Sequence, residues 1–129
     1  MKNRNLYVID DDKIYHFLLK NLLKQNNINV NSTFFANGHD AIEFLSANND
    51  NEILPDIILL DVNMPIMNGW QFLEDYIKLK GTLLKEPVIY MISSSNNEVD
   101  INKAREFTGV VNEYFLKPIC KEDLDKIFV

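Results

Sequence analysis

The sequence predicts an α/β domain in which a parallel sheet of five strands carries helices on both faces and is wound by right-handed crossovers. Short apolar runs of strand length alternate with longer amphipathic segments along all 129 residues. Residues 57–60 are four consecutive aliphatic side chains, which is typical of a strand covered on both faces in a parallel sheet. Because no repeat or linker interrupts the alternation, we expect one domain spanning residues 1–129.

The first strand and the first helix are predicted at residues 6–9 and 13–26. The strand is a short apolar run, and Asp12 is placed to cap the amino end of the helix. A three-and-four spacing through the helix predicts the side that faces the protein. The positions on that side are Ile14, Phe17, Leu18, Asn21 and Leu22.

The next elements run up to the aliphatic strand. Residues 28–35 alternate apolar and polar side chains, which predicts a less buried strand near the edge of the sheet. A turn at residues 36–38 leads into a short helix at residues 39–47. After a polar loop, the third strand is expected at residues 56–60.

The second half of the chain continues the alternation. A helix with aromatic and aliphatic positions, including a core Trp70, is followed by a strand and a weakly amphipathic helix. A strand that ends in Lys117 and a short last helix complete the pattern. These five elements are expected at residues 69–80, 88–92, 98–107, 113–116 and 121–128.

The charge of the chain argues against a nucleic-acid or membrane partner. The chain has 13 Lys and Arg residues against 19 Asp and Glu residues, a formal net charge of −6, and no basic run. Nucleic acids and anionic membranes both attract clustered Lys and Arg. No apolar segment is long enough for a signal peptide or a membrane span, so we expect a cytoplasmic location.

Cys120 is the only cysteine, which excludes an intrachain disulfide and a cysteine-based metal cluster. We interpret it as a small apolar packing residue. Only two histidines are present, one in each of the first two helices, so zinc and copper sites are not expected.

Polar side chains follow four of the predicted strands at their carboxyl ends. The Asp10-Asp11-Asp12 run follows the first strand, Asp61 the third, Ser93 the fourth and Lys117 the fifth. The carboxyl ends of parallel strands meet at one edge of the sheet, which is where open α/β sheets bind ligands. We therefore expect these side chains to converge.

Carboxylates held within a few ångströms of one another repel and require a cation at neutral pH. Oxygen ligands select a hard ion, so Mg²⁺ is expected, with Mn²⁺ as a substitute. An aspartate can form an acyl phosphate, which makes Asp61 the candidate nucleophile for a phosphoryl group. Lys117 supplies positive charge and Ser93 a hydroxyl donor for the phosphoryl oxygens.

The motifs that carry these residues resemble those of the receiver domains of two-component response regulators. The matching segments are Asp10-Asp11, Asp61 with the Met-Pro-Ile-Met-Asn-Gly turn at residues 64–69, Ser93, and Lys117-Pro118. The resemblance covers essentially the whole chain. It implies a flavodoxin-like, doubly wound five-stranded sheet in the order 2-1-3-4-5.

The resemblance also implies roles for the residues of the site. Asp11 is expected to bind the metal ion directly, together with Asp61 and the backbone carbonyl of Asn63, while Asp10 is expected to bind it through water. The same resemblance implies that Ser95, together with Asn63, influences how fast water attacks the acyl phosphate.

For the conformational switch, the resemblance implies that Ser93 moves toward the phosphoryl group and that Tyr114 rotates inward behind it. Phosphorylation would shift a two-state equilibrium, because the new contacts exist only in the active arrangement.

The expected function is that of a response regulator. Asp61 accepts a phosphoryl group from a sensor histidine kinase or a phosphotransfer protein, in an Mg²⁺-dependent reaction, and the chain then controls a downstream protein. Such a chain is not a conventional enzyme, because it catalyses only its own phosphorylation and dephosphorylation. We expect no separate effector domain, no direct contact with nucleic acid or membrane, and a monomer or a weak phosphorylation-dependent dimer.

Two alternatives stay open at the level of the sequence. In a small phosphatase of the haloacid dehalogenase kind, Asp10 would be the nucleophile and Asp12 the acid/base. That kind usually has Thr or Val where this chain has Ile14, and it leaves the Met-Pro turn unexplained. A pseudo-receiver that binds partners without phosphorylation would lack an acid or the lysine, and none is missing here.

Overall fold

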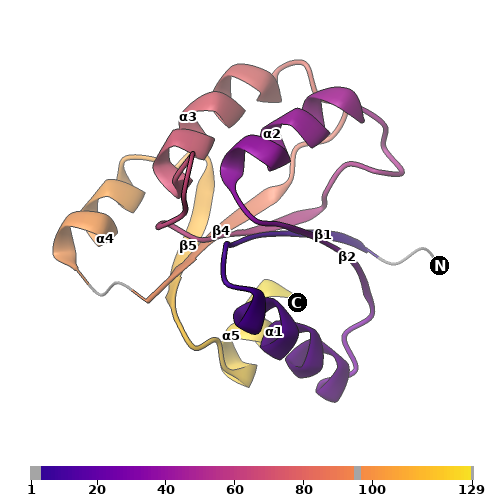
Figure 1. The fold of residues 1–129 in the computed structure, drawn as a ribbon, viewed down its shortest axis with the longest axis vertical. Coiled ribbons are helices and arrows are strands. Elements are labelled where there is room, and N and C mark those ends of the chain that lie inside the picture. Colours follow the sequence, from indigo (N-terminus) through magenta and orange to yellow (C-terminus); the bar gives the residue numbers. More distant parts are fainter. Residues whose placement is uncertain (1–3, 95–96, 129) are drawn as a thin grey trace.

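The computed structural model describes residues 4–94 and 97–128 and contains one five-stranded parallel sheet (Figure 1). The strand order is β2-β1-β3-β4-β5, so the predicted sheet and its order are confirmed. The strands are β1 (Arg4–Ile9), β2 (Val30–Phe35), β3 (Ile57–Leu60), β4 (Val88–Ser93) and β5 (Val111–Leu116).

Helices cover both faces of the sheet, as predicted. The helices α2, α3 and α4 contribute to the apolar cluster on one face, and α1 and α5 to the cluster on the other (Figure 1). Their bounds are α1 (Lys13–Gln25), α2 (Gly38–Ala47), α3 (Gly69–Lys80), α4 (Glu98–Arg105) and α5 (Lys121–Ile127). Among the described residues, no helix has the length and apolar character needed to cross a membrane.

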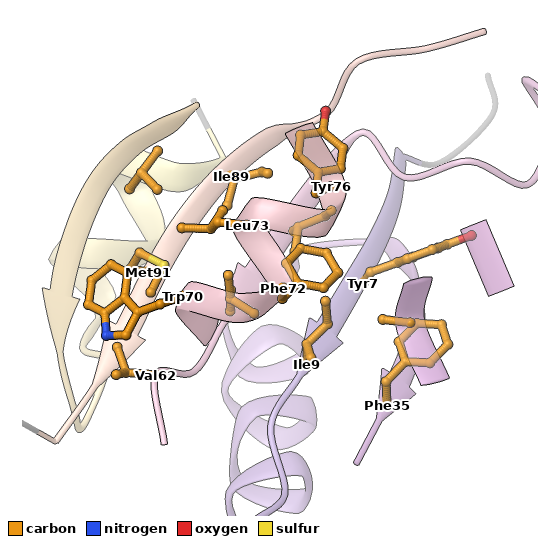
Figure 2. Close-up of a cluster of buried hydrophobic side chains, with 14 of the residues drawn as sticks. Tyr7, Ile9, Phe35, Val62, Trp70, Phe72, Leu73, Tyr76, Ile89 and Met91 are labelled. Atoms are coloured by element: carbon orange, nitrogen blue, oxygen red, sulfur yellow. The ribbon is translucent and has the colours of Figure 1, made fainter. Parts of the chain in front are cut away.

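The central strand β3 explains why the sheet needs a layer of helices on each face. Successive side chains of a strand point to opposite faces. In β3, Ile58 and Leu60 therefore join the α2/α3/α4 cluster, while Ile57 and Leu59 join the α1/α5 cluster. Figure 2 shows the first cluster, in which Trp70 is buried as predicted.

Helix α1 buries a different side from the predicted one. Leu19 and Leu23 are buried in the α1/α5 cluster, whereas Ile14, Phe17 and Leu18 are 72%, 63% and 58% exposed. The helix carries apolar side chains at helical spacing on two adjacent sides, and the crossover from β1 turns only one of them toward the sheet. Of the predicted apolar positions, Leu22 packs partly against the α1/α5 cluster, whereas Ile14, Phe17 and Leu18 lie on the outer side of the helix.

Cys120 is also placed differently from the prediction. It is exposed immediately before α5, and its Sγ lies 3.3 Å from Asp123 Oδ2. The packing role fails because the segment between β5 and α5 runs along the surface, where Ile119 rather than Cys120 turns into the α1/α5 cluster.

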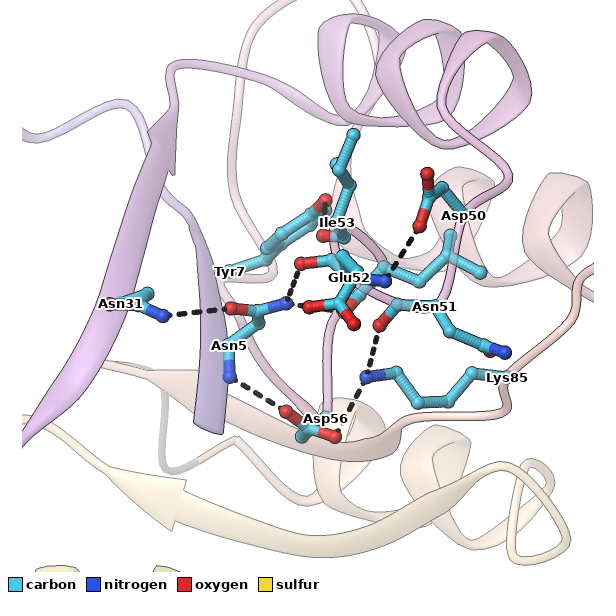
Figure 3. Close-up of polar contacts among 10 residues, drawn as sticks. Asn5, Tyr7, Asn31, Asp50, Asn51, Glu52, Ile53, Asp56 and Lys85 are labelled. Atoms are coloured by element: carbon cyan, nitrogen blue, oxygen red, sulfur yellow. Dashed lines mark hydrogen bonds and ion pairs between the residues drawn. The ribbon is translucent and has the colours of Figure 1, made fainter. Parts of the chain in front are cut away.

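A polar network at the amino edge of the sheet fixes the register of β1 against β3 (Figure 3). Asn5 donates its Nδ2 to the carbonyls of Glu52 and Leu54 at 2.9 and 3.0 Å, and its backbone N to Asp56 Oδ2 at 2.7 Å. Lys85 Nζ lies 2.9 Å from Asp56 Oδ1. β3 is only four residues long. Anchoring its amino end therefore also fixes the position of Asp61, which directly follows its carboxyl end.

Candidate functional site

The carboxyl edge of the sheet brings together the side chains that follow β1, β3, β4 and β5. Ile9 pairs with Leu60 and Ser93 with Leu116, so the strands end at a common level. At this edge Asp10, Asp61 and Ser93 are buried, although all three are polar. Buried polar groups of this kind are rare unless they are paired or bind a ligand.

Three carboxyl groups form the acidic part of this edge. Carboxylate oxygens of Asp10, Asp11 and Asp61 all lie within 4.8 Å of one another. Asp10 and Asp61 are buried, while Asp11 is exposed. Their backbones belong to the sheet: Asp10 N donates to Phe35 O at 3.0 Å, and Asp61 N donates to Ile9 O at 2.9 Å. The cluster is therefore held on rigid backbone.

Lys117 supplies a positive charge beside Asp10 and Asp61. Its Nζ lies 2.7 Å from Asp10 Oδ2 and 3.6 Å from Asp61 Oδ1. Its backbone N donates to Ser93 O at 2.9 Å, and the Lys117-Pro118 peptide bond is cis. Burial lowers the pKa of Lys117, but the contacts with Asp10 and Asp61 outweigh it and raise the pKa above its ordinary value. The ammonium is thus charged at neutral pH.

Asp61 has the most perturbed carboxyl group of the cluster. Burial, followed by repulsion from Asp10, raises the pKa of Asp61 from 3.8 to about 7. Lys117 and a hydrogen bond from the backbone of Val62 oppose the rise without cancelling it. In the absence of a cation, Asp61 therefore holds a proton far more readily than an exposed aspartate does.

The oxygen donors of the cluster fit a hard divalent cation. Carboxylate oxygens and backbone carbonyls are the ligands that Mg²⁺ accepts, and Mg²⁺ usually keeps several waters beside one or two carboxylates. With all three carboxylates ionised and Lys117 protonated, the cluster has a net charge of −2. One divalent cation would neutralise it. Repulsion from Asp10 adds to the effect of burial in raising the pKa of Asp61.

The loop between β3 and α3 packs against the backbone of Asp61. Asn68 and Gln71 form a reciprocal capping box at the start of α3, with both hydrogen bonds at 2.9 Å. A Cβ at Gly69 would overlap the backbone carbonyl of Asp61, so only glycine fits this position. Ile66, at the tip of the loop, has a left-handed backbone with φ of 67°. The Met-Pro turn is thus a strained and closely packed support for Asp61.

The structure also places Asn63, Tyr114 and Asp12. Asn63 is exposed, two residues after Asp61. Tyr114 is half-buried on β5, where it pairs with Met91 of β4. Asp12 caps α1, because its Oδ1 accepts from the backbone N of Ile14 and Tyr15 at 2.9 and 3.2 Å. Ser95 lies outside the described residues.

One residue near the cluster was missed at the level of the sequence. The ring of Tyr15, in the first turn of α1, lies over Lys117, with 4.4 Å between the ring centroid and Nζ. Nothing in the local pattern of α1 signals this contact, because its partner comes from the end of β5. The only available hint was a Tyr three residues after the end of the acidic run.

Comparison with known proteins agrees with this geometry. Among curated relatives, the response regulator Rcp1 of Synechocystis is 30% identical over 124 residues, which cover 95% of this chain and 82% of Rcp1. The Regulator of RpoS of Escherichia coli K12 is 29% identical over 124 residues, covering 96% of this chain but 32% of that protein. This chain therefore spans about a third of the length of that regulator.

Solved structures show the same fold. A two-component response regulator from Cytophaga hutchinsonii superposes with a TM-score of 0.87 at 26% identity, over 99% of this chain and 96% of the other. The Mn²⁺-bound form of Rcp1 superposes with a TM-score of 0.74 at 26% identity, over 95% and 87% of the two chains. Residues 6–128 match the family described as the response regulator receiver domain. The chain belongs to this family of two-component signalling domains.

Proposed function

We propose that this receiver domain is a phospho-acceptor switch in which Asp61 takes a phosphoryl group from a sensor histidine kinase or a phosphotransfer protein. The observation that carries the proposal is the pairing of a buried nucleophilic carboxylate with a lysine ammonium 3.6 Å away, inside a cluster of three acids. Phosphoryl transfer asks a protein for this arrangement, an oriented nucleophile with positive charge near the equatorial oxygens.

The cluster is the proposed site for Mg²⁺, with Mn²⁺ as a substitute. Asp11, Asp61 and the backbone carbonyl of Asn63 would bind the ion directly, and Asp10 would bind it through water. The ion would neutralise the excess negative charge and lower the pKa of Asp61, so that its carboxylate would be available at neutral pH. The Mn²⁺-bound form of the relative Rcp1 supports a divalent ion in this family.

In the transfer step, an Oδ of Asp61 attacks phosphorus, and the bond from phosphorus to the donor imidazole nitrogen breaks. The electron pair of that bond leaves with the imidazole, and the product on Asp61 is an acyl phosphate. Lys117 neutralises the phosphoryl oxygens during the transfer. Hydrolysis later breaks the bond between phosphorus and Asp61, and returns the carboxylate and inorganic phosphate.

The proposed switch follows from the same contacts. Ser93 is fully buried at the end of β4, and its hydroxyl would donate to a phosphoryl oxygen on Asp61. Tyr114 lies half-buried on the neighbouring strand, beside a groove that Ile101 and Ala104 of α4 also line. Phosphorylation would stabilise the arrangement in which Ser93 binds the phosphate and Tyr114 fills space behind it, and a downstream protein would bind that surface.

The exposed side of α1 is the proposed contact for the phosphohistidine protein. Ile14, Phe17 and Leu18 are exposed on α1, which begins directly after the acidic run, and Leu18 lines a groove with Pro118 and Ile119. An apolar patch of this kind on a surface helix marks a protein interface. A donor must bring its histidine to Asp61, so a surface that borders the cluster suits that partner.

The small-phosphatase alternative is disfavoured by the contacts of its two acids. Asp10 Oδ1 accepts from Asp12 N at 2.9 Å, and Asp10 Oδ2 is paired with Lys117, so both oxygens are engaged. Asp12 caps α1 and therefore lacks the freedom that an acid/base needs.

The test is phosphorylation by acetyl phosphate and Mg²⁺, followed by the intact mass and by mapping of the adduct. We expect a gain of one phosphoryl group that disappears in Asp61→Asn. An adduct on Asp10, or steady hydrolysis that survives Asp61→Asn, would support the phosphatase instead. No adduct from several donors would support a pseudo-receiver.

The α1 contact is tested with Phe17→Glu and with Leu84→Glu as its control, because both native side chains are 63% exposed. Transfer from a panel of purified histidine kinases and phosphotransfer proteins of the source genome should slow at least tenfold in Phe17→Glu only. Phosphorylation by acetyl phosphate should be unchanged in both variants, since neither touches the cluster. Equal transfer rates in the two variants would place the donor elsewhere.

A further inference from the structure

Tyr15 and Lys117 form a contact that the mechanism above does not use. The ring centroid of Tyr15 lies 4.4 Å from Lys117 Nζ, and the same Nζ lies 2.7 Å from Asp10 Oδ2. The ammonium therefore contacts an aromatic ring and a buried carboxylate at once. The Lys117 side chain is 17% exposed, so water competes little for either contact.

The ring has a physical reason to matter for Lys117. A cation within about 6 Å of an aromatic centroid is attracted to the ring, and the attraction strengthens when both groups are withdrawn from water. Lysine also has a long stem with several rotatable bonds, so an unrestrained ammonium samples many positions. Tyr15 also lines a groove together with Leu18, Leu19 and Leu22 of the same helix.

The hydroxyl of Tyr15 has no comparable role in this arrangement. Its oxygen is buried and has no hydrogen-bond partner among the described residues. Burial, together with the negative charge of Asp10, Asp61 and Asp123, raises the pKa of Tyr15, so the phenol is neutral. The face of the ring, and not the polar end, is the part of Tyr15 that contacts Lys117.

We propose that Tyr15 is a positioning residue whose ring holds the Lys117 ammonium beside Asp10 and Asp61, ready for the phosphoryl group. This inference rests on the proposed phosphorylation of Asp61 and deepens it. In this role the ring acts through Lys117. Without the ring, the Lys117 ammonium would be found less often beside Asp61, where it neutralises the phosphoryl oxygens.

The first test compares Tyr15→Leu, which removes the ring, with Tyr15→Phe, which keeps it and removes the hydroxyl. With acetyl phosphate and Mg²⁺, Tyr15→Leu should slow phosphorylation of Asp61 about 5- to 30-fold, as expected from the strength of a cation–π contact. Tyr15→Phe should stay within about twofold of the native rate. If Tyr15→Phe is as slow as Tyr15→Leu, the hydroxyl is the active group and the proposal is wrong.

The second test asks whether Tyr15 acts through Lys117. In a Lys117→Gln background, Tyr15→Leu should slow phosphorylation no further, because the ring no longer has an ammonium to hold. A general structural defect would instead slow the reaction in both backgrounds by the same factor. Additive losses would therefore overturn the proposal.

A third measurement separates this proposal from the proposed function. The ring should shift the NMR resonances of the Lys117 Cε protons upfield in the native protein and in Tyr15→Phe, and the shift should vanish in Tyr15→Leu. If the native protein takes no phosphate, the proposed function fails while the shift still tests the contact. If the native protein is phosphorylated but the shift is absent, the positioning role fails alone.

Discussion

The replacement of Asp61 by asparagine should stabilise the metal-free protein, and the gain should grow with pH. The folded protein holds the proton of Asp61 with a pKa of about 7, against an ordinary value of 3.8. The folded state therefore binds more protons than the unfolded state between these two pH values. It follows that the free energy of unfolding falls as pH rises through this window.

The magnitude follows from the same shift. A rise from 3.8 to about 7 corresponds to about 4 kcal/mol at 1.36 kcal/mol per pKa unit. This pKa already includes the attraction of Lys117. The asparagine side chain of the variant would carry no charge at any pH, so Asp61→Asn should be more stable by about 4 kcal/mol at pH 8 and by about 2 kcal/mol at pH 5.

The assay is urea unfolding with EDTA at pH 5, 6, 7 and 8. Asp125→Asn, at an exposed position on α5, is the matched control and should change the free energy of unfolding by less than about 0.5 kcal/mol at every pH. Millimolar Mg²⁺ should stabilise the native protein and narrow the difference at pH 8, because the cation removes the repulsion. A difference that is the same at pH 5 and pH 8 would refute the electrostatic reasoning.

Three further predictions follow from the packing around the site. Leu19→Ala should lower the free energy of unfolding by about 2–5 kcal/mol, because Leu19 is buried. Leu18→Ala should lower it by less than about 1 kcal/mol, because Leu18 is exposed. Thermal unfolding of both variants tests which side of α1 is buried. Gly69→Ala should destabilise the protein by more than about 1 kcal/mol and slow phosphorylation, since its Cβ would displace the Asp61 carbonyl; a native melting temperature would contradict the close approach. Lys117→Ala should still allow some phosphorylation of Asp61 by acetyl phosphate, but the NMR signals of Tyr114 should no longer respond to it.

Much of the fold was accessible from the sequence because it depends on local patterns. The four aliphatic residues of β3 predicted a strand covered on both faces, and residues 69–80 predicted α3 with its observed bounds. Polar residues at strand ends predicted which side chains would meet at one edge of the sheet. These features depend on the order of residues along one element, and parallel winding then brings the strand ends together.

Other predictions failed where two elements had to meet. The outer side of α1 was taken for its inner side, because apolar residues lie on two sides of that helix and only the sheet selects one. Cys120 was expected to be a small apolar packing residue, but it is exposed immediately before α5. Both errors concern orientation, which a short apolar pattern does not specify.

The sequence by itself determined the α/β class, the order of the elements and the acids and lysine that end the strands, because each is written in a contiguous segment. Only the tertiary structure decided which side of α1 faces the sheet, that Gly69 approaches the Asp61 carbonyl, and that Tyr15 lies over Lys117. The physical reason is that these contacts join residues from different crossovers. Their distances are set by how helices pack on the sheet, and no single segment encodes that packing.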